Sequence, residues 1–305
     1  MSDVDVPTTD SAASGDLPLH GQTPLSATAR PVLQKRLRKV ARRIAQCARA
    51  ADLSPDDVHE LRVAIRRCAA ALDTFRPLLS KRRSKRFRKR LKQIRKAAGE
   101  VRDLDIVLER LLTAQLDPAA VDAAGTDDWL DRRHRAIRAL RRAARDEVDC
   151  ELKRRAKGLV RRVRWRGDGQ EPTIATAAPG LLRPIADRCR KYGTCDLTAV
   201  RKLHQFRVHV KLLRYASEFV QPGLNADSCR TLQEILSDLQ QKLGSICDRV
   251  ATIRLLNGPD FAHQEDAADL VAREQAALTG LQTGFITWWE SEGRNRFEQA
   301  IDENL

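Results

Sequence analysis

The sequence has little of what several large protein classes require. Aromatic residues make up only 4% of its 305 residues. No segment alternates Val, Ile or Tyr with polar residues as a half-buried strand does. There is no glycine-rich phosphate loop and no Gly-x-Ser-x-Gly elbow, the signatures of many nucleotide-binding enzymes and serine hydrolases. These absences argue against a strand-rich fold and against the commonest catalytic sites.

Cysteine and histidine are present without the spacing that disulfide frameworks or metal sites need. The seven cysteines are an odd number, are scattered, and form no Cys-x-x-Cys pair, which favours reduced, buried thiols. No two of the six histidines lie four residues apart with a carboxylate between them. We therefore expect no metal and no cofactor.

Targeting and membrane-spanning patterns are also missing. The chain begins without the basic, apolar and small-residue segments of a signal peptide, and no apolar run approaches the length of a membrane span. We expect a cytoplasmic protein with no membrane partner. Residues 1–29 contain four Asp and no Lys or Arg, which predicts a disordered acidic tail.

Positive charge is abundant but unevenly placed. The chain carries a formal charge of +15, and charged residues make up 32% of it. Residues 1–166 hold 40 basic and 22 acidic residues, whereas 167–305 hold 16 and 19. The excess therefore predicts a polyanionic partner that is attracted mainly by the first half.

An internal repeat relates the two halves. VHELRVAIRR at 58–67 aligns with LHQFRVHVKL at 203–212 at an offset of 145 residues. The same offset, without a gap, places Gly99 on Gly244 and Asp103 on Asp248. A shared register of this length indicates two copies of one structural unit.

Apolar residues recur at helical spacing throughout both copies. Val58, Leu61, Ile65, Cys68 and Leu72 form one such seam. Helices are expected in the first copy at about 30–50, 55–78, 82–114 and 127–165, and in the second at 179–192, 196–220, 226–255 and 265–300. The pattern predicts an all-α fold of two four-helix bundles related by a pseudo-two-fold axis. We expect one domain over 30–305, with halves 30–166 and 179–305 joined by a linker at 167–178.

A polar stripe runs beside each seam. On a helix His59, Arg62 and Arg66 lie within about 60° of one another, and His204, Arg207, Lys211 and Arg214 repeat the arrangement. Forked guanidinium groups suit phosphate oxygens. The structural alternative is that these cations pair with acids on neighbouring helices, for which Asp73, Asp103, Glu218 and Asp248 are available. We expect Asp103 and Asp248 to orient neighbouring arginines.

The densest charge run is KRRSKRFRKRLKQIRK at 81–96, with eleven basic residues in sixteen. Such runs are ordinarily solvated faces or nucleic-acid patches. This run has no interleaved acid, so self-repulsion between neighbouring turns disfavours the helix alone and a bound polyanion would stabilise it. We expect part of it to line or flank the path of an anion, namely Lys85, Arg88, Lys89, Lys92, Arg95 and Lys96. The segment 132–166 adds a second basic surface that acids dilute.

Two half-motifs give the chain a family resemblance. His-x-x-Arg-Val-x-x-Arg-Arg at 59–67, followed by Gly-x-x-Arg-Asp-Leu-Asp at 99–105, resembles the CHAD domain, the conserved histidine α-helical domain. The second half-motif runs from His204 to Glu218 and from Leu239 to Asp248. The resemblance covers about 30–300 and implies two four-helix bundles with a basic groove between them. It further implies non-enzymatic binding of inorganic polyphosphate, often at polyphosphate granules.

The family motif assigns phosphate binding to eight residues of this chain, which are His59, Arg62, Arg66, Arg67, His204, Arg207, Lys211 and Arg214. Some positions depart from the pattern. Cys247 is aligned with Arg102, Leu212 is aligned with Arg67, and the helix at 226–241 is neutral to acidic. We therefore expect the two halves to contribute unequally to binding, with fewer contacts in the second half.

Two other functions compete with polyphosphate binding. Charge alone would support a DNA- or RNA-binding protein, but the basic segments 81–96 and 132–166 contain only Phe87 and Trp165 as aromatic residues, too few for base stacking. An enzyme acting on phosphoanhydrides would need clustered carboxylates to hold metal ions, and the sequence shows none. We expect no catalytic residue.

Overall fold

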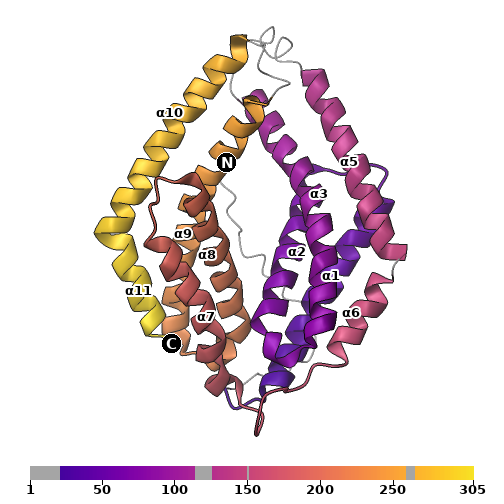
Figure 1. Ribbon diagram of the computed structural model, residues 1–305, viewed down its shortest axis with the longest axis vertical. Coiled ribbons are helices and arrows are strands. Elements are labelled where there is room, and N and C mark those ends of the chain that lie inside the picture. The colour runs from indigo at the N-terminus through magenta and orange to yellow at the C-terminus, as the bar shows by residue number, and fades with distance from the viewer. Residues whose placement is uncertain (1–20, 114–125, 150, 259–264) are drawn as a thin grey trace. The chain divides into compact units, whose positions relative to one another are not determined.

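The described part of the chain is helical. The computed structural model describes residues 21–113, 126–149, 151–258 and 265–305 (Figure 1). Within these residues there is no strand, and the only β-type pairing is an isolated bridge between Pro24 and Thr173. The all-α class is therefore confirmed. The long helices are α1 (Leu25–Arg49), α2 (Pro55–Thr74), α3 (Lys81–Thr113), α5 (Thr126–Asp149), α7 (Ile174–Gly193), α8 (Val200–Val220), α9 (Ala226–Leu256) and α10 (Glu265–Trp288).

Shorter helical segments join or finish the long ones. Helix α6 spans Leu152–Val160 and α11 spans Arg294–Asp302. The 3-10 turns η1 (Arg76–Leu78) and η2 (Gln221–Gly223) follow α2 and α8, and a π turn, η3, occupies Trp289–Gly293. The segment 265–300, which was expected to be a single helix, is thus interrupted after Trp288.

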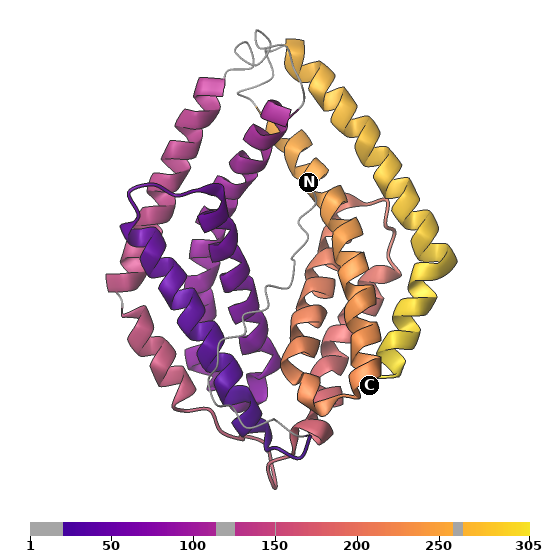
Figure 2. The same cartoon turned by 180° about the vertical axis from the view of Figure 1, so that it is seen from behind.

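Two compact units divide the chain. Unit 1 contains 21–29, Trp165–Cys247 and Leu278–Leu305, and unit 2 contains Arg30–Arg164 and Asp248–Ala277. Each unit thus holds most of one sequence copy, and the end of α9 with the start of α10 packs in unit 2. Figure 2 shows the same helices from behind.

The repeat is visible in where the elements begin. Helices α2 and α8 begin at residues 55 and 200, η1 and η2 at 76 and 221, and α3 and α9 at 81 and 226. Each pair differs by 145 residues, the offset found in the sequence. The order and spacing of these elements are therefore duplicated, while the pseudo-two-fold relation between the halves stays a prediction.

Local signals set the start and end of α2. Ser54 accepts a hydrogen bond from the backbone N–H of Asp57, whose carboxylate accepts one from the N–H of Ser54, forming a capping box. Pro55 stands at the first helical position, where its missing N–H leaves no helical bond unmade. The helix ends at Thr74, and the expected extension to residue 78 is instead the 3-10 turn containing Pro77.

The core of unit 2 includes residues from both sequence copies. Leu104, Val107 and Leu108 of α3 pack with Trp129 of α5 and with Leu256 and Leu270. All six are less than 10% exposed. Burial of large side chains contributes about 1.5–3 kcal/mol each. This cluster therefore holds the C-terminal part of α3 against the start of α5.

Three further boundaries differ from those expected. The helix expected at 127–165 is broken before α6, where Glu151 adopts a left-handed φ of 59°. Helix α7 begins at Ile174, because Thr173 caps it by accepting from the N–H of Thr176. Residues 174–178 of the expected linker are therefore helical. Helix α1 begins at Leu25, so residues 25–29 of the expected tail are helical, and residues 1–20 lie outside the described part.

Candidate anion-binding surfaces

The stripe of unit 2 lies at the edge of the core, as its angular position predicts. Val58, Leu61 and Ile65 of α2 are buried, whereas His59, Arg62, Arg66 and Arg67 are half-buried. Half-buried cations are screened less by water than exposed ones, so a bound anion would attract them more strongly.

A glycine lies beneath the central arginine of each stripe. A Cβ added at Gly99 of α3 would lie 3.0 Å from Nη1 of Arg62, and one added at Gly244 of α9 would lie 3.8 Å from Nη2 of Arg207. Glycine inside a helix costs about 1 kcal/mol relative to alanine. Gly99 therefore gives Arg62 room to cross α3, whereas a Cβ at position 244 would make only ordinary contact with Arg207.

Asp103 contributes a partly opposing charge to the stripe of unit 2. Burial raises the pKa of the Asp103 carboxyl. The charge of Arg62 lowers this pKa, that of Asp248 raises it, and those of Arg254 and Arg102 lower it. The charge of Arg62 thus interacts with an acid on a neighbouring helix, as expected if the stripe cations pair with internal carboxylates.

The stripe of unit 1 is less uniform. His204 is exposed, and Arg207 and Lys211 are half-buried. Arg214 is only 9% exposed, and its guanidinium lies 5.4 Å from the centroid of the Tyr215 ring. Arg214 is therefore the least accessible of the residues assigned to binding, and packing accounts for part of its role.

Helix α3 presents one largely unneutralised face. Ser84, Phe87, Leu91 and Ile94 are buried, and the six cations selected from the sequence lie away from this core. Arg88 forms an ion pair with Asp73 of α2. The other five are exposed, and none has an ion pair among the described residues; they are Lys85, Lys89, Lys92, Arg95 and Lys96.

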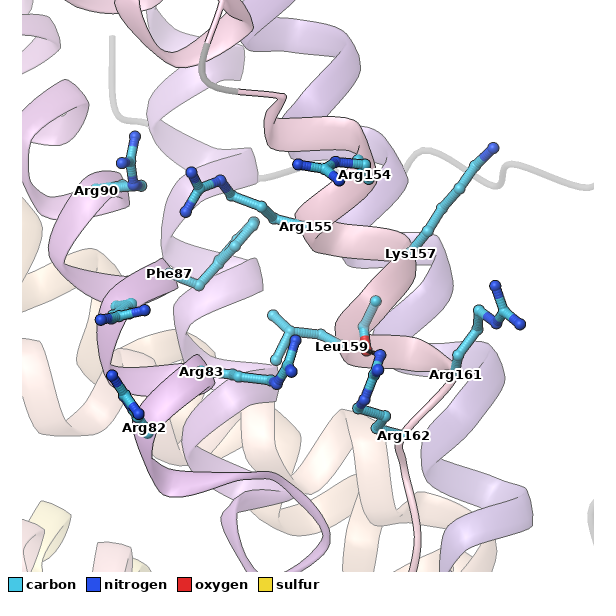
Figure 3. Close-up of a pocket in the computed structure, with 12 residues that line it drawn as sticks. Arg82, Arg83, Phe87, Arg90, Arg154, Arg155, Lys157, Leu159, Arg161 and Arg162 are labelled. Carbon is cyan, nitrogen blue, oxygen red and sulfur yellow. Dashed lines mark hydrogen bonds between the residues drawn. The ribbon is translucent and has the colours of Figure 1, made fainter.

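A second cationic surface, which the selection from sequence missed, lies where α6 packs beside α3. Nine basic residues line this groove without an acid, together with Phe87, Gly158 and Leu159 (Figure 3). The basic residues are Arg82, Arg83, Arg86, Arg90, Arg154, Arg155, Lys157, Arg161 and Arg162. Helical spacing could have shown that 82, 86 and 90 share a face, but not that α6 lies beside them.

Several arginines of α5 have structural roles instead. Arg133 donates to the buried Asp105 carboxylate at 2.6 Å and to the Leu53 carbonyl at 2.9 Å. Arg145 donates to the Ala48 carbonyl at 3.1 Å. These bonds satisfy carbonyls at and just beyond the end of α1. The basic segment 132–166 is therefore divided between packing and a free surface.

Other kinds of site find no support within the described residues. No three His, Cys, Asp or Glu side chains gather there as metal ligands would. The helices in these ranges are too polar or too short to cross a bilayer.

The helices and charges together define an all-α protein whose cationic surface is concentrated on one unit. A family model described as the CHAD domain matches residues 31–257. The chain belongs to the CHAD domain family.

Solved structures share this fold. The CHAD domain from the plant Ricinus communis is 22% identical, with a TM-score of 0.62 and coverage of 94% of both chains. PptA from Streptomyces chartreusis is 18% identical, with a TM-score of 0.62 and coverage of 91% of this chain and 99% of that one. No curated protein sequence matches the chain.

Proposed function

We propose that this protein binds inorganic polyphosphate without catalysing its turnover. The observation that carries the proposal is the exposed, unneutralised face of α3 described above. Five exposed cations lie along one side of this single helix, where a flexible chain of phosphates can follow them. Each phosphate contact releases counterions, which favours binding of long polyanions.

The half-buried stripes add directional contacts to this charge. Arg62 and Arg207 each cross a glycine, so each guanidinium lies close to the neighbouring helix of its own unit. A guanidinium held in place can donate to two phosphate oxygens at once. We assign the long-range attraction to α3 and the short-range contacts to the stripes.

Aromatic content favours polyphosphate over nucleic acid. Phe87 is buried and Trp165 is half-buried, so neither basic segment offers an exposed ring on which bases could stack. Binding to the backbone of duplex DNA would use the same cations. The competition experiment below distinguishes such binding from polyphosphate binding.

We propose no catalytic role, because two acids close to these cations already pair with arginines. Hydrolysis of phosphoanhydrides with metal ions needs carboxylates that converge on the phosphate. Asp105 is bound by Arg133, and Asp73 by Arg88.

We further propose a cytoplasmic location at polyphosphate granules, which co-localisation of a tagged chain with stained granules would test.

A competition assay tests the proposed ligand. Long-chain polyphosphate bound to the full chain should resist displacement by excess duplex DNA at an ionic strength of about 150–200 mM. Ready displacement would favour a nucleic-acid-binding protein. Release of orthophosphate on incubation with polyphosphate and Mg²⁺ would identify an enzyme.

A further inference from the structure

The groove between α3 and α6 has the geometry of a discrete site. Arg83 from α3 extends toward α6 and Arg155 from α6 extends toward α3, at different levels of the groove, and Phe87 and Leu159 project between the two helices (Figure 3). Phe87 and Leu159 are 3% and 4% exposed. The site therefore has an apolar floor and a cationic rim, within one unit of the protein.

Acids pair with some of the cations on this rim and not with others. Arg90 lies against both carboxylate oxygens of Glu147 at 3.0 Å, and Arg154 pairs with Glu151. Among the described residues, Arg82, Arg83 and Arg86 have no ion pair. Like charges this close repel one another, so a multiply charged anion would relieve the repulsion.

Not every lining cation faces the groove. Lys157 and Arg161 point away from α3 (Figure 3) and also line a neighbouring hollow between α6 and α1. Arg162 donates to the Gly158 carbonyl at 3.3 Å. Arg83 and Arg155 are therefore the pair best placed to hold a ligand between the two helices.

The size of the groove limits what it can hold. It encloses about 720 Å³, within the range of about 300–1,000 Å³ that is typical of small-molecule sites. We propose that it is a separate binding site for a compact group of adjacent phosphates. Two sources share this chemistry, a short linear phosphate chain and a polyol that carries several phosphates.

This site is distinct from the face that carries the proposed function. Successive helical residues turn by about 100°, which places 82, 86 and 90 on one flank of the buried seam of α3. Residues 85, 92 and 95 lie on the other flank, and Lys89 and Lys96 lie between the two flanks, opposite the seam. The groove therefore uses different residues from the exposed face, with Arg82 and Lys89 lying within about 20° of each other on α3.

Isothermal titration of the full chain tests the groove with three probes, namely tripolyphosphate, inositol hexakisphosphate and orthophosphate. The test variant combines Arg83→Glu with Arg155→Glu. The matched control combines Arg135→Glu with Arg142→Glu, two exposed arginines of α5 in the same unit. Both variants change the net charge equally.

We expect the test variant to weaken tripolyphosphate binding about tenfold or more, given the usual strength of charge-assisted hydrogen bonds. The control should change it far less. Comparing tripolyphosphate with inositol hexakisphosphate identifies which source the groove prefers.

Two results would overturn the proposed site. One is an equal loss of tripolyphosphate affinity in the test and control variants, and the other is wild-type protein that binds tripolyphosphate no more tightly than orthophosphate. If charge reversal unfolds the test variant, as judged by circular dichroism, Arg83→Gln with Arg155→Gln replaces it under the same criteria. Long-chain binding, measured in parallel, shows separately whether the proposed function fails.

Discussion

Helices α3 and α9 occupy aligned positions in the two sequence copies, yet their surfaces differ. Residues 81–96 of α3 hold eleven cations and no acid, whereas 226–241 of α9 hold one cation, Arg230, and three acids. Both helices are long, with 33 and 31 residues. The charge of α3 is therefore not needed to form a helix at this position.

What the two helices share is the buried seam. Phe87, Leu91 and Ile94 of α3 align with Leu232, Leu236 and Leu239 of α9, and all six are buried. The apolar spacing specifies the fold in both copies, and the exposed positions are left to differ. The cations of α3 are therefore not required by the fold, and the proposed binding of a polyanion accounts for them.

The largest expected effect comes from reversing the arginine that both copies keep. Arg62→Glu combined with Arg207→Glu should weaken long-chain polyphosphate binding about a hundredfold, because each half-buried arginine loses a charge-assisted contact. The control reverses the exposed Arg273 and Arg294, one in each unit. Fluorescence anisotropy with labelled polyphosphate measures both variants.

The single arginine variants sharpen the comparison. If the field of α3 governs binding, Arg62→Glu should cost more affinity than Arg207→Glu. Equal losses in the two single variants would mean that the copies contribute alike, and a loss as large in the Arg273 and Arg294 control would remove the special role of the stripes.

Reversing charges on the exposed face of α3 should lower the affinity for polyphosphate by less than reversing the two stripe arginines. Lys85→Glu, Lys89→Glu and Lys92→Glu together should lower the slope of log affinity against log salt by about one unit for each lost phosphate contact. On α9, Arg230→Glu at the position aligned with Lys85 should leave that slope nearly unchanged. A large effect of Arg230→Glu would contradict the unequal contribution of the two halves.

The sequence predicted the repeated elements well, because their starts depend on local patterns. Apolar spacing and the Ser54–Pro55–Asp57 cap are properties of a few adjacent residues, and α2 begins at the predicted position. The start of α1 was missed because its support is non-local. The backbone N–H of Leu25 donates to the Pro172 carbonyl at 3.0 Å, a contact that no short window reveals.

The break before α6 was missed for a different reason. Val148 and Leu152 keep the helical spacing of four across Glu151, so the periodicity continues through a residue with left-handed backbone. The same break sets the course of α6 beside α3. Sequence reasoning therefore chose the α3 flank of Lys85 and Lys92 and did not identify the flank of Arg83, which becomes a groove only through α6.

The aligned glycines provide a test of arginine placement. Alanine at either position should favour the helix by up to about 1 kcal/mol. Alanine at position 244 would make only ordinary contact with Arg207, so the Gly244→Ala variant should bind polyphosphate as the wild type does. Gly99→Ala would require the Arg62 guanidinium to shift by a few tenths of an ångström, which should weaken polyphosphate binding while thermal stability is retained. Identical affinities in the two variants would show that the position of Arg62 does not matter.

The smallest expected effect concerns the aligned acids. Burial raises the pKa of Asp103, so the folded state binds more protons than the unfolded state just above the ordinary carboxyl value. The free energy of unfolding should therefore fall as pH rises through this raised pKa. Asp103→Asn removes that titration, so its stability relative to wild type should increase from acidic to neutral pH in urea unfolding. Asp248→Asn should reduce the same slope in part, because the Asp248 charge also raises the pKa of Asp103. A stability difference between Asp103→Asn and wild type that stays constant with pH would contradict this electrostatic coupling between α3 and the end of α9.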